Sequence, residues 1–341
     1  MRQRMRSKKY VVIGLMLGLM ILLSGCRENE YPEDCRNYVI IPSSQDVYSQ
    51  QVCEAFKNTA ERYGANVIIK MPEDTSAQSQ VAILKEIKDK NIDCLAISAN
   101  GSSVFQEELE EMVARGVKVI GFDQVMQGGK EGIAMQVCSS RLEKTGDMFL
   151  SIVEKNIKSE TKQIAILMPN SFQYNEVAYA KDIRGLLEAG TYPDILLTEI
   201  NYMNDDSEKC REKVKHLVET YPDLSVIFTT STTSTVTASE YLKENGLADK
   251  VKTVGIALPD RVLDLVGEDN VCVGIIYCEP TKLGKLTALA ARAITEEGFI
   301  AQEGEVLKTE ELGNYPVETL VMEYGSQIPA VYMQDSPNFM Q

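Results

Sequence analysis

The strongest constraint in the sequence is a repeated alternation between short apolar runs and longer segments with apolar residues three or four positions apart. Short runs rich in β-branched residues predict strands, and the longer periodic segments predict helices. In the first half, strands are expected at 38–41, 66–70, 94–98, 118–122 and 133–137, with helices at 47–63, 76–90 and 104–115. Because parallel neighbours need a crossover connection, this order predicts an α/β fold with helices on both faces of a parallel sheet.

The same alternation begins again after residue 138. Strands are expected at 163–167, 195–200, 224–229, 252–256 and 271–277, with helices such as 176–188 and 233–245. About ten strands exceed what one sheet of this type usually carries, so we expect two doubly wound parallel-sheet lobes. The segments expected to return the chain between the lobes are 282–297, 306–308 and 319–323. The expected division is 38–138 plus 279–308 for lobe 1 and 139–278 plus 309–341 for lobe 2.

The N-terminus has the pattern of an export signal. A basic segment precedes an apolar run at 11–23, which is shorter than the ~20 residues that a spanning helix needs. Leu23-Ser24-Gly25-Cys26 resembles the lipobox of bacterial lipoproteins, which implies removal of residues 1–25 and a lipid on Cys26. The polar segment 26–37 is expected to be a tether. The alternative is an uncleaved membrane helix with a chance cysteine, and either reading places the bulk of the chain outside the cytoplasm.

The charge balance argues against nucleic acid and anionic lipid as partners. The formal net charge is −15, and loss of the leader, which carries cations and no acid, would make it more negative. A surface of this sign repels phosphate groups. The lipid on Cys26, rather than a basic patch, is therefore expected to hold the protein at the membrane.

Cysteine and histidine usage predicts neither a metal site nor a catalytic site. The seven cysteines other than Cys26 lack the close spacing of a disulfide framework or zinc site, so most are expected to be buried thiols, although the pattern leaves disulfides open. The single histidine, His216, lies in a charged helical stretch, which disfavours a Ser-His-Asp hydrolase. No phosphate-binding or dinucleotide-binding glycine motif follows a strand, so no cofactor is expected.

The loops that follow the predicted strands are the expected ligand site, because ligands of open parallel sheets bind beyond the carboxyl ends of the strands. Hydroxyls, amides and carboxylates beside aromatic rings suit a polyhydroxylated ligand. The candidate ligand-binding residues are Ser43, Ser44, Asn100, Asp123, Tyr174, Asn175, Glu176, Thr230, Cys278 and Glu279. The same residue types also cap helices, and for 230–234 both readings stay open. Asp123 is the strongest candidate, since an acid at a buried strand end is costly unless something pairs with it.

Several stretches carry a resemblance to a known family. The segments 38–44, 93–100, 116–123, 224–230 and 275–284 resemble the sugar-type periplasmic binding proteins, the extracellular receptors of ABC importers. The patterns at 96–100 and 117–123 are most similar to the rhamnose and autoinducer receptors. The resemblance implies a type I fold of two α/β lobes that are joined by three crossovers and close on a ligand. It also implies that Asp123 binds ligand, that 174–176 adds contacts from lobe 2, and that Cys278-Glu279 stands where the family often has Asp or Gln.

The sequence also departs from this family at the site. Gln124 and Asn175 stand where ribose-type members carry Arg, and Ser43 and Ser44 stand where quorum-signal receptors use a Lys. Cys278 replaces an Asp of the same receptors. The ligand, a sugar or a furanosyl signal, is therefore left open. The chain has no tryptophan, so stacking on a sugar would fall to tyrosine or phenylalanine, and the candidates are Tyr174, Tyr277, Phe105 and Phe172.

These patterns predict a monomeric, lipid-anchored, extracytoplasmic solute-binding protein. It would capture a small sugar-like ligand by hinge closure and deliver it to an ABC permease. The alternative keeps the fold but signals to a membrane sensor kinase without transport. An enzyme on the same scaffold is disfavoured by the missing histidines and phosphate loop. The chain also resembles the effector domains of DNA-binding repressors, which the export signal and the lack of a preceding helix-turn-helix oppose.

Overall fold

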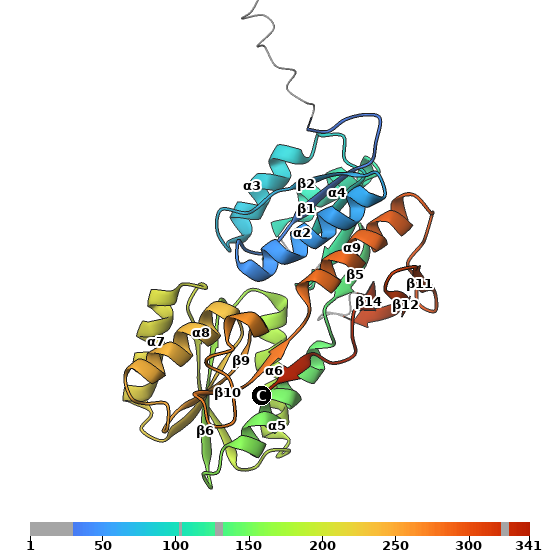
Figure 1. The fold of residues 1–341 in the computed structure, drawn as a ribbon. Helices are drawn as coiled ribbons and strands as arrows, with labels where there is room; N and C mark the ends of the chain where they lie inside the picture. The colour runs from blue at the N-terminus through green and yellow to red at the C-terminus, as the bar shows by residue number, and fades with distance from the viewer. Residues whose placement is uncertain (1–29, 102–103, 127–131, 322–326) are drawn as a thin grey trace, which may run out of the picture.

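The computed structural model describes residues 30–101, 104–126, 132–321 and 327–341. These residues form two lobes stacked end to end, each a mainly parallel sheet with helices on both faces (Figure 1). The predicted fold class is confirmed. The leader and Cys26 lie outside the described residues, so signal cleavage and the lipid on Cys26 stay predictions. Among the helices described, none combines the length and the apolar character that crossing a membrane requires.

Lobe 1 contains a sheet with the strand order β13-β14-β5-β4-β3-β1-β2. Its parallel strands are β1 (Asn37–Ile41), β2 (Asn66–Ile69), β3 (Cys94–Ile97), β4 (Lys118–Phe122) and β5 (Ile133–Cys138). Its helices are α2 (Val47–Arg62), α3 (Ala77–Ile87), α4 (Gln106–Ala114) and α9 (Pro280–Thr295). In β1, Tyr38 and Ile40 pack toward α2 and α9, whereas Val39 and Ile41 pack toward α3 and α4. The strand is buried on both faces, which explains its continuous apolar run.

Lobe 2 contains a sheet with the strand order β15-β10-β9-β8-β6-β7. Its strands are β6 (Lys162–Met168), β7 (Ile195–Tyr202), β8 (Leu224–Thr229), β9 (Lys252–Ile256), β10 (Cys272–Tyr277) and β15 (Asn338–Met340). Helices α5 (Thr145–Asn156) and α6 (Tyr174–Glu188) cover one face, and α7 (Ser207–Thr220) and α8 (Thr232–Glu244) cover the other. As predicted, Cys94 in lobe 1 and Cys272 in lobe 2 are buried free thiols within strands.

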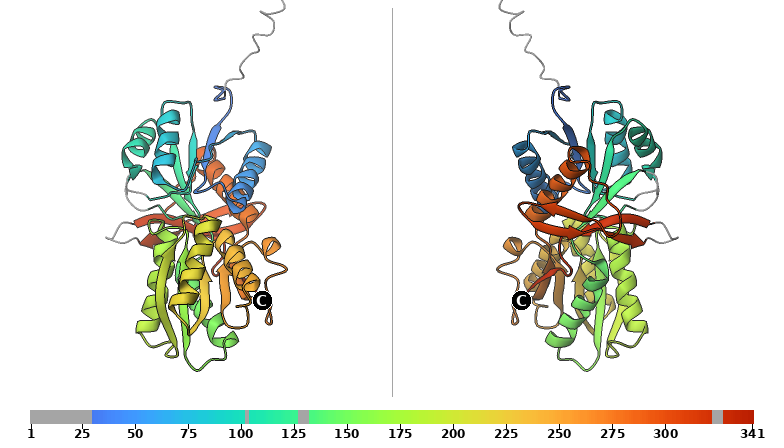
Figure 2. Two further views of the ribbon diagram at one scale, coloured as in Figure 1. Left: turned by 90° about the vertical axis from the view of Figure 1, so that its left-hand side faces the viewer. Right: turned by 90° about the vertical axis from the view of Figure 1, so that its right-hand side faces the viewer.

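The described chain passes between the lobes three times, after β5, after β10 and after β14. The assignment of 309–341 to lobe 2 is wrong for β13 (Glu318–Val321) and β14 (Gln327–Tyr332), which extend the sheet of lobe 1 beside β5. In the same segment β15 joins lobe 2, whereas β12 (Gly313–Pro316) forms a separate hairpin with the preceding strand β11 (Val306–Thr309). In Figure 2 the red C-terminal strands cross the molecule at its waist. The physical reason for the difference is that β14 covers an edge of β5 that would otherwise stay unpaired.

Helix α9 begins at the second crossover and lies directly on α2. Gly284 permits this contact, because a Cβ atom at that position would lie 2.2 Å from the carbonyl oxygen of Val52. Any larger residue would push the two helices apart. The close approach therefore ties the start of α9, and with it the crossover, to the helix that follows β1.

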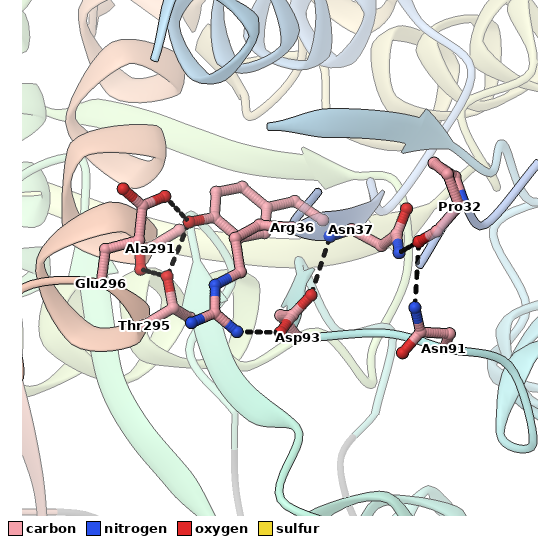
Figure 3. Close-up of polar contacts among 9 residues, drawn as sticks. Pro32, Arg36, Asn37, Asn91, Asp93, Ala291, Thr295 and Glu296 are labelled. Carbon is pink, nitrogen blue, oxygen red and sulfur yellow. Dashed lines mark hydrogen bonds and ion pairs between the residues drawn. The ribbon is translucent and has the colours of Figure 1, made fainter. Parts of the chain in front are cut away.

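The segment before β1 is docked on lobe 1. Tyr31 is buried in the core that α3 and α4 cover. The carbonyl oxygen of Pro32 accepts hydrogen bonds from the side-chain amides of Asn37 (2.7 Å) and Asn91 (3.0 Å) (Figure 3). The expectation that 26–37 is a tether is wrong for its described part, because Tyr31 buries an aromatic ring in lobe 1 and Asn37 is the first residue of β1.

Asp93 fastens the same end of β1. Its carboxylate accepts hydrogen bonds from the Asn37 backbone N–H (2.9 Å) and from the Arg36 guanidinium (2.6 Å) (Figure 3). The next residue, Tyr38, donates its hydroxyl hydrogen to Glu296 at the end of α9 (2.8 Å). These bonds lie at the amino ends of the strands, so this end of lobe 1 is a fixed base and the opposite end is available for a ligand.

Candidate ligand-binding cleft

A cavity of about 130 Å³ lies between the lobes. It is lined by residues that follow β1, β4, β6, β7, β8, β9 and β10, so it occupies the carboxyl ends of both parallel sheets. A single water molecule needs roughly 10–15 Å³ of such space, so the cavity has room for about ten atoms of that size. Its size and position fit a monosaccharide rather than a polymer or a single ion.

Most of the predicted candidates line this cavity. Those that do are Ser43, Ser44, Asp123, Asn175, Glu176, Thr230 and Cys278. The loop 230–234 caps a helix and also lies at the cavity. Ser231 caps α8 through a capping box with Ser234, while the Thr230 hydroxyl faces the cavity and donates to Glu176 (2.5 Å).

Three of the predicted candidates do not line the cavity. Glu279 is exposed at the N-terminus of α9, where Pro280 turns the chain into the helix. Tyr174 packs sideways against the apolar cluster around Val125 and Ile328. Asn100 is fully buried behind the cavity wall. The strand-end rule placed the loops correctly, but the direction of each side chain depends on packing that the rule does not include.

Four side-chain amides join the lobes beside the cavity, and we call Asn100, Gln124, Gln173 and Asn175 the amide bridge. Gln173 of lobe 2 donates to Asn100 Oδ1 of lobe 1 (2.6 Å). Asn175 accepts from the Val125 N–H (3.3 Å), donates to the Asp123 carbonyl (3.2 Å), and gives its own N–H to Gln124 Oε1 (3.4 Å). The structure is therefore a closed form in which neutral groups hold the two lobes together.

Asp123 directly follows β4 and faces the cavity. Its φ of 54° lies in the left-handed region, which Asp and Asn tolerate better than most residues. The Tyr48 hydroxyl donates to its Oδ1 at 3.4 Å. Desolvation, reinforced by the charge of Asp46, raises the pKa of Asp123 to about 6. No lysine, arginine or histidine among the described lining residues offsets the charge of this acid, which lies in a low-dielectric position.

Glu176 faces the cavity from the first turn of α6. It is buried, and desolvation raises its pKa to about 8, with further contributions from the charges of Asp205 and Asp123. The short hydrogen bond from Thr230 acts in the opposite direction but does not compensate. At neutral pH this carboxyl group therefore holds its proton far more often than an exposed glutamate does.

Two further acids complete the lining, and we call Asp46, Asp123, Glu176 and Asp205 the cavity acids. Asp46 caps α2 by accepting from the Ser49 N–H (2.7 Å). Asp205 follows β7 with a φ of 53° and accepts from the Ser231 hydroxyl (2.7 Å). Its pKa is raised by desolvation and by the charge of Asp46 from the opposite lobe. Two acids thus approach from each side of the cleft.

Three tyrosines supply the aromatic surface of the cavity, namely Tyr48, Tyr179 and Tyr277. Of the four predicted stacking candidates, Tyr277 alone lines the cavity. Phe105 is fully buried in the core of lobe 1, and Phe172 is exposed on the surface. Burial, followed by the neighbouring carboxylates, raises the pKa of both Tyr48 and Tyr179 well above the ordinary value, so both hydroxyls stay protonated and can donate.

The sequence contained usable signals for some of the residues that were missed. Tyr179 lies three and four positions after Glu176 and Asn175, so the three share one face of α6. Asp205 follows β7, a strand end from which no candidate was taken. Tyr48 is the second residue of α2, so its side chain can still reach back to the strand ends.

The described residues hold no group of three or more His, Cys, Asp or Glu side chains placed to bind a metal. His216 lies on the outside of α7, where its Nε2 is 3.3 Å from Glu199, away from the cleft. The cavity therefore offers hydrogen-bond acceptors, hydroxyls and ring faces. This set of groups is suited to holding a small polar molecule.

Comparison with known proteins agrees with this geometry. Residues 37–298 match the family model described as a periplasmic binding protein domain. An ABC transporter solute-binding protein from Clostridium phytofermentas with bound L-rhamnose is 20% identical, with a TM-score of 0.83 over 90% of this chain and 96% of that chain. LsrB from Clostridium saccharobutylicum in complex with AI-2 is 14% identical, with a TM-score of 0.78 over 89% of this chain and 97% of that chain.

A third relative extends the comparison to another sugar complex. A solute-binding protein from Burkholderia graminis in complex with D-arabinose is 21% identical, with a TM-score of 0.70 over 78% of this chain and 91% of that chain. At these identities the structures share the fold, whereas the family match covers most of the sequence. The family predicted from the sequence is confirmed, and the chain belongs to the periplasmic binding proteins.

Proposed function

We propose that this protein captures a small sugar-like ligand between its lobes outside the cytoplasm and delivers it to an ABC permease. The observation that carries the proposal is the interlobe cavity, which is monosaccharide-sized and lined from both sheets by hydroxyl, amide, carboxyl and tyrosine groups. Such groups match a polyol, whose hydroxyls both donate and accept. The sugar complexes among the structural neighbours support the same class of ligand.

Binding acts through closure of the cleft. Residues from lobe 1, such as Ser43 and Asp123, and residues from lobe 2, such as Glu176 and Thr230, can contact one ligand together only when the lobes approach. A ligand that binds the closed form better shifts the population toward it. The permease would then distinguish loaded from empty protein by the arrangement of the lobes.

The partner that receives the closed form is part of the proposal. Import requires a permease, and the alternative, a membrane sensor kinase, would recognise the same closed form without transport. Cys26 as a lipid anchor and a monomeric state complete the proposed arrangement. Import is favoured because the neighbours with bound sugars are transporter components.

A thermal-shift screen against pentoses, deoxyhexoses, hexoses and furanosyl signals tests the ligand class. At a ligand concentration 100 times the dissociation constant, the free energy of unfolding should rise by ~2.7 kcal/mol, which is readily detected. The sugar should be recovered chemically unchanged after incubation. If no member of the panel shifts the melting temperature, the sugar-like ligand is wrong, and if the sugar is converted, the protein is an enzyme.

Cell fractionation tests the anchor separately. The Cys26→Ser variant should leave the membrane fraction and appear as a soluble protein, because the proposed lipid attaches to the thiol. Cys35→Ser is the matched control, since Cys35 lies close by in the chain but outside the lipobox. Retention of Cys26→Ser at the membrane after washing would place the anchor elsewhere.

A further inference from the structure

The charge of the cavity is one-sided. The cavity acids Asp46, Asp123, Glu176 and Asp205 line it together, and among the described residues no lysine, arginine or histidine does so. Neutral polyols are recognised by hydroxyls and amides, which the cavity also contains. Four acids without a cation exceed what hydrogen bonding to a neutral ligand requires, because each buried carboxylate carries a desolvation cost.

The contacts of the cavity acids do not neutralise them. The recorded hydrogen-bond donors to these carboxylates are hydroxyls and one backbone N–H, at 2.5 to 3.4 Å. A neutral donor satisfies one lone pair but supplies no positive charge, so each acid that is ionised keeps its charge, and Glu176, with a pKa of about 8, avoids part of the cost by holding its proton. The amide bridge does not neutralise the cavity acids either, because its side chains are uncharged. The Asn175 amide is bonded to backbone groups of Asp123 and Val125, and Gln124 accepts from the Asn175 N–H.

Closure also brings the acids of the two lobes toward each other. Asp46 and Asp123 belong to lobe 1, and Glu176 and Asp205 belong to lobe 2. The charge of Asp46 acts on Asp205, and the charge of Asp123 acts on Glu176, raising the pKa of each acid of lobe 2. Like charges in a partly desolvated space oppose the empty closed form. A positive charge placed between them would turn this repulsion into attraction.

We propose that the ligand is a polyhydroxylated amine, a molecule of monosaccharide size that carries an ammonium group among its hydroxyls. This inference rests on the proposed function and names the class of ligand more narrowly. An ammonium group presents three donors and no acceptor, so it matches carboxylates on both sides of the cleft. The rings of Tyr48, Tyr179 and Tyr277 line the same space and can cover the C–H surface of the ligand.

Isothermal titration calorimetry with matched pairs tests the proposal. Each amine, among them glucosamine, galactosamine, mannosamine and 6-amino-6-deoxyglucose, is compared with its parent sugar, which has a hydroxyl in place of the amine. We expect at least one amine to bind roughly ten- to a hundredfold tighter than its parent, because charge-assisted hydrogen bonds are about twice as strong as neutral ones. The preference should persist at moderate salt, since buried charges are screened less than exposed ones.

Two variants locate the preference at the cavity acids. Asp123→Asn and Asp205→Asn each remove one charge at a position with a φ near 54°, which asparagine tolerates, so both should fold. Each should reduce the ratio of amine affinity to parent affinity by about tenfold. Glu279→Gln is the matched control, since it also removes one negative charge but lies exposed outside the cavity lining. It should leave the ratio unchanged.

The outcomes separate this inference from the proposed function. If a neutral sugar binds and its amine binds equally or less tightly, the amine proposal is wrong while the sugar-binding function stands. If neither amines nor neutral sugars bind, the proposed function is wrong and the amine proposal falls with it. If an amine binds tightly but Asp123→Asn and Asp205→Asn keep the full preference, as the control Glu279→Gln does, the cavity acids are not its cause and the proposal is likewise overturned.

Discussion

The amide bridge and the cavity acids lie side by side in the cleft but act on it in opposite directions. The bridge consists of neutral groups with complementary donors and acceptors, so Asn175 and Gln173 pull the lobes together whether or not a ligand is present. The cavity acids bring four carboxyl groups into one desolvated space without a cation among the described lining residues. The hydrogen bonds of the amide bridge are made within the protein, whereas the cavity acids need a ligand to offset their charge.

This difference suggests how a hinge protein can close selectively. If amides alone faced each other across the cleft, the empty protein would close as readily as the loaded one. Its partner could then not distinguish the two. Repulsion between acids raises the free energy of the empty closed form, and a ligand removes that cost. The balance between the two regions therefore sets the difference between empty and loaded protein, and each region can be altered separately.

The largest expected effect is a pH dependence of closure in the ligand-free protein. In the closed form desolvation and the charges of Asp205 and Asp123 raise the pKa of Glu176 to about 8, and opening, which hydrates the cleft and moves Asp123 away, should lower it toward the ordinary value of 4.5. The closed form therefore binds the proton more tightly. The stabilisation of the closed form by this proton is complete below about pH 4.5. It is lost as the pH rises from there through about 8, and over that range the ratio of closed to open protein falls by up to about tenfold per pH unit. Small-angle X-ray scattering between pH 5 and 9 should show a larger radius of gyration at high pH.

Glu176→Gln supplies the control for this titration. Glutamine keeps the size of the side chain and an acceptor for the Thr230 hydroxyl, but it cannot ionise. The variant should stay compact at pH values where the wild type opens, apart from a smaller change near pH 6 from Asp123. An identical opening curve in both proteins would show that Glu176 does not govern closure.

Asp123→Asn is expected to have the next largest effect, on affinity. Loss of a charge-assisted hydrogen bond costs ~1.5–3 kcal/mol, so binding of the ligand found in the screens should weaken roughly ten- to a hundredfold. The melting temperature of the empty protein should change little or rise, because the buried charge is removed while the Tyr48 contact is kept. Calorimetry and a melting curve on one variant decide the matter. A strongly destabilised variant with normal affinity would mean that Asp123 is structural.

Asn175→Ala is expected to have the smallest effect. It should favour the open form, whereas Glu176→Gln favours the closed form. Asn175→Ala removes the two hydrogen bonds that the Asn175 side chain makes between the lobes, each with a net worth of about 0.5–1.5 kcal/mol, and keeps the backbone N–H that bonds to Gln124. The empty protein should open further at every pH, and affinity should fall several-fold through the harder closure. Scattering on Asn175→Ala and on Asn175→Asp would distinguish loss of the bridge from added charge. No change in either variant would contradict the holding role of the bridge.

The sequence was sufficient for the elements whose pattern is local. Strand β4 begins and ends where its apolar run does, at Lys118 and Phe122, and Asp123 follows it into the cavity as expected. It was insufficient where partners are remote in the chain. The pairing of β14 with β5 joins residues almost two hundred positions apart, and a short apolar segment such as 327–332 does not specify which edge it will cover.

The same distinction explains the site. Loop positions follow from strand ends, but the role of Asn100 depends on Gln173, a residue of the other lobe that turns it from a ligand contact into a bridge. Contacts between lobes arise only after each lobe has folded, so no local pattern records them.

The docked segment before β1 also shortens the linker between the proposed lipid anchor and lobe 1. With the proposed lipid on Cys26, the chain to Glu30 can span at most about 14 Å when fully extended. Glu30 is already held to lobe 1 by its ion pair with Lys70 (2.9 Å), and Tyr31 is buried beside it. The base of lobe 1 would then lie close to the lipid headgroups, and the cleft would face away from them. Presenting both lobes to a permease would require that permease to rise above the bilayer, or this segment to peel away.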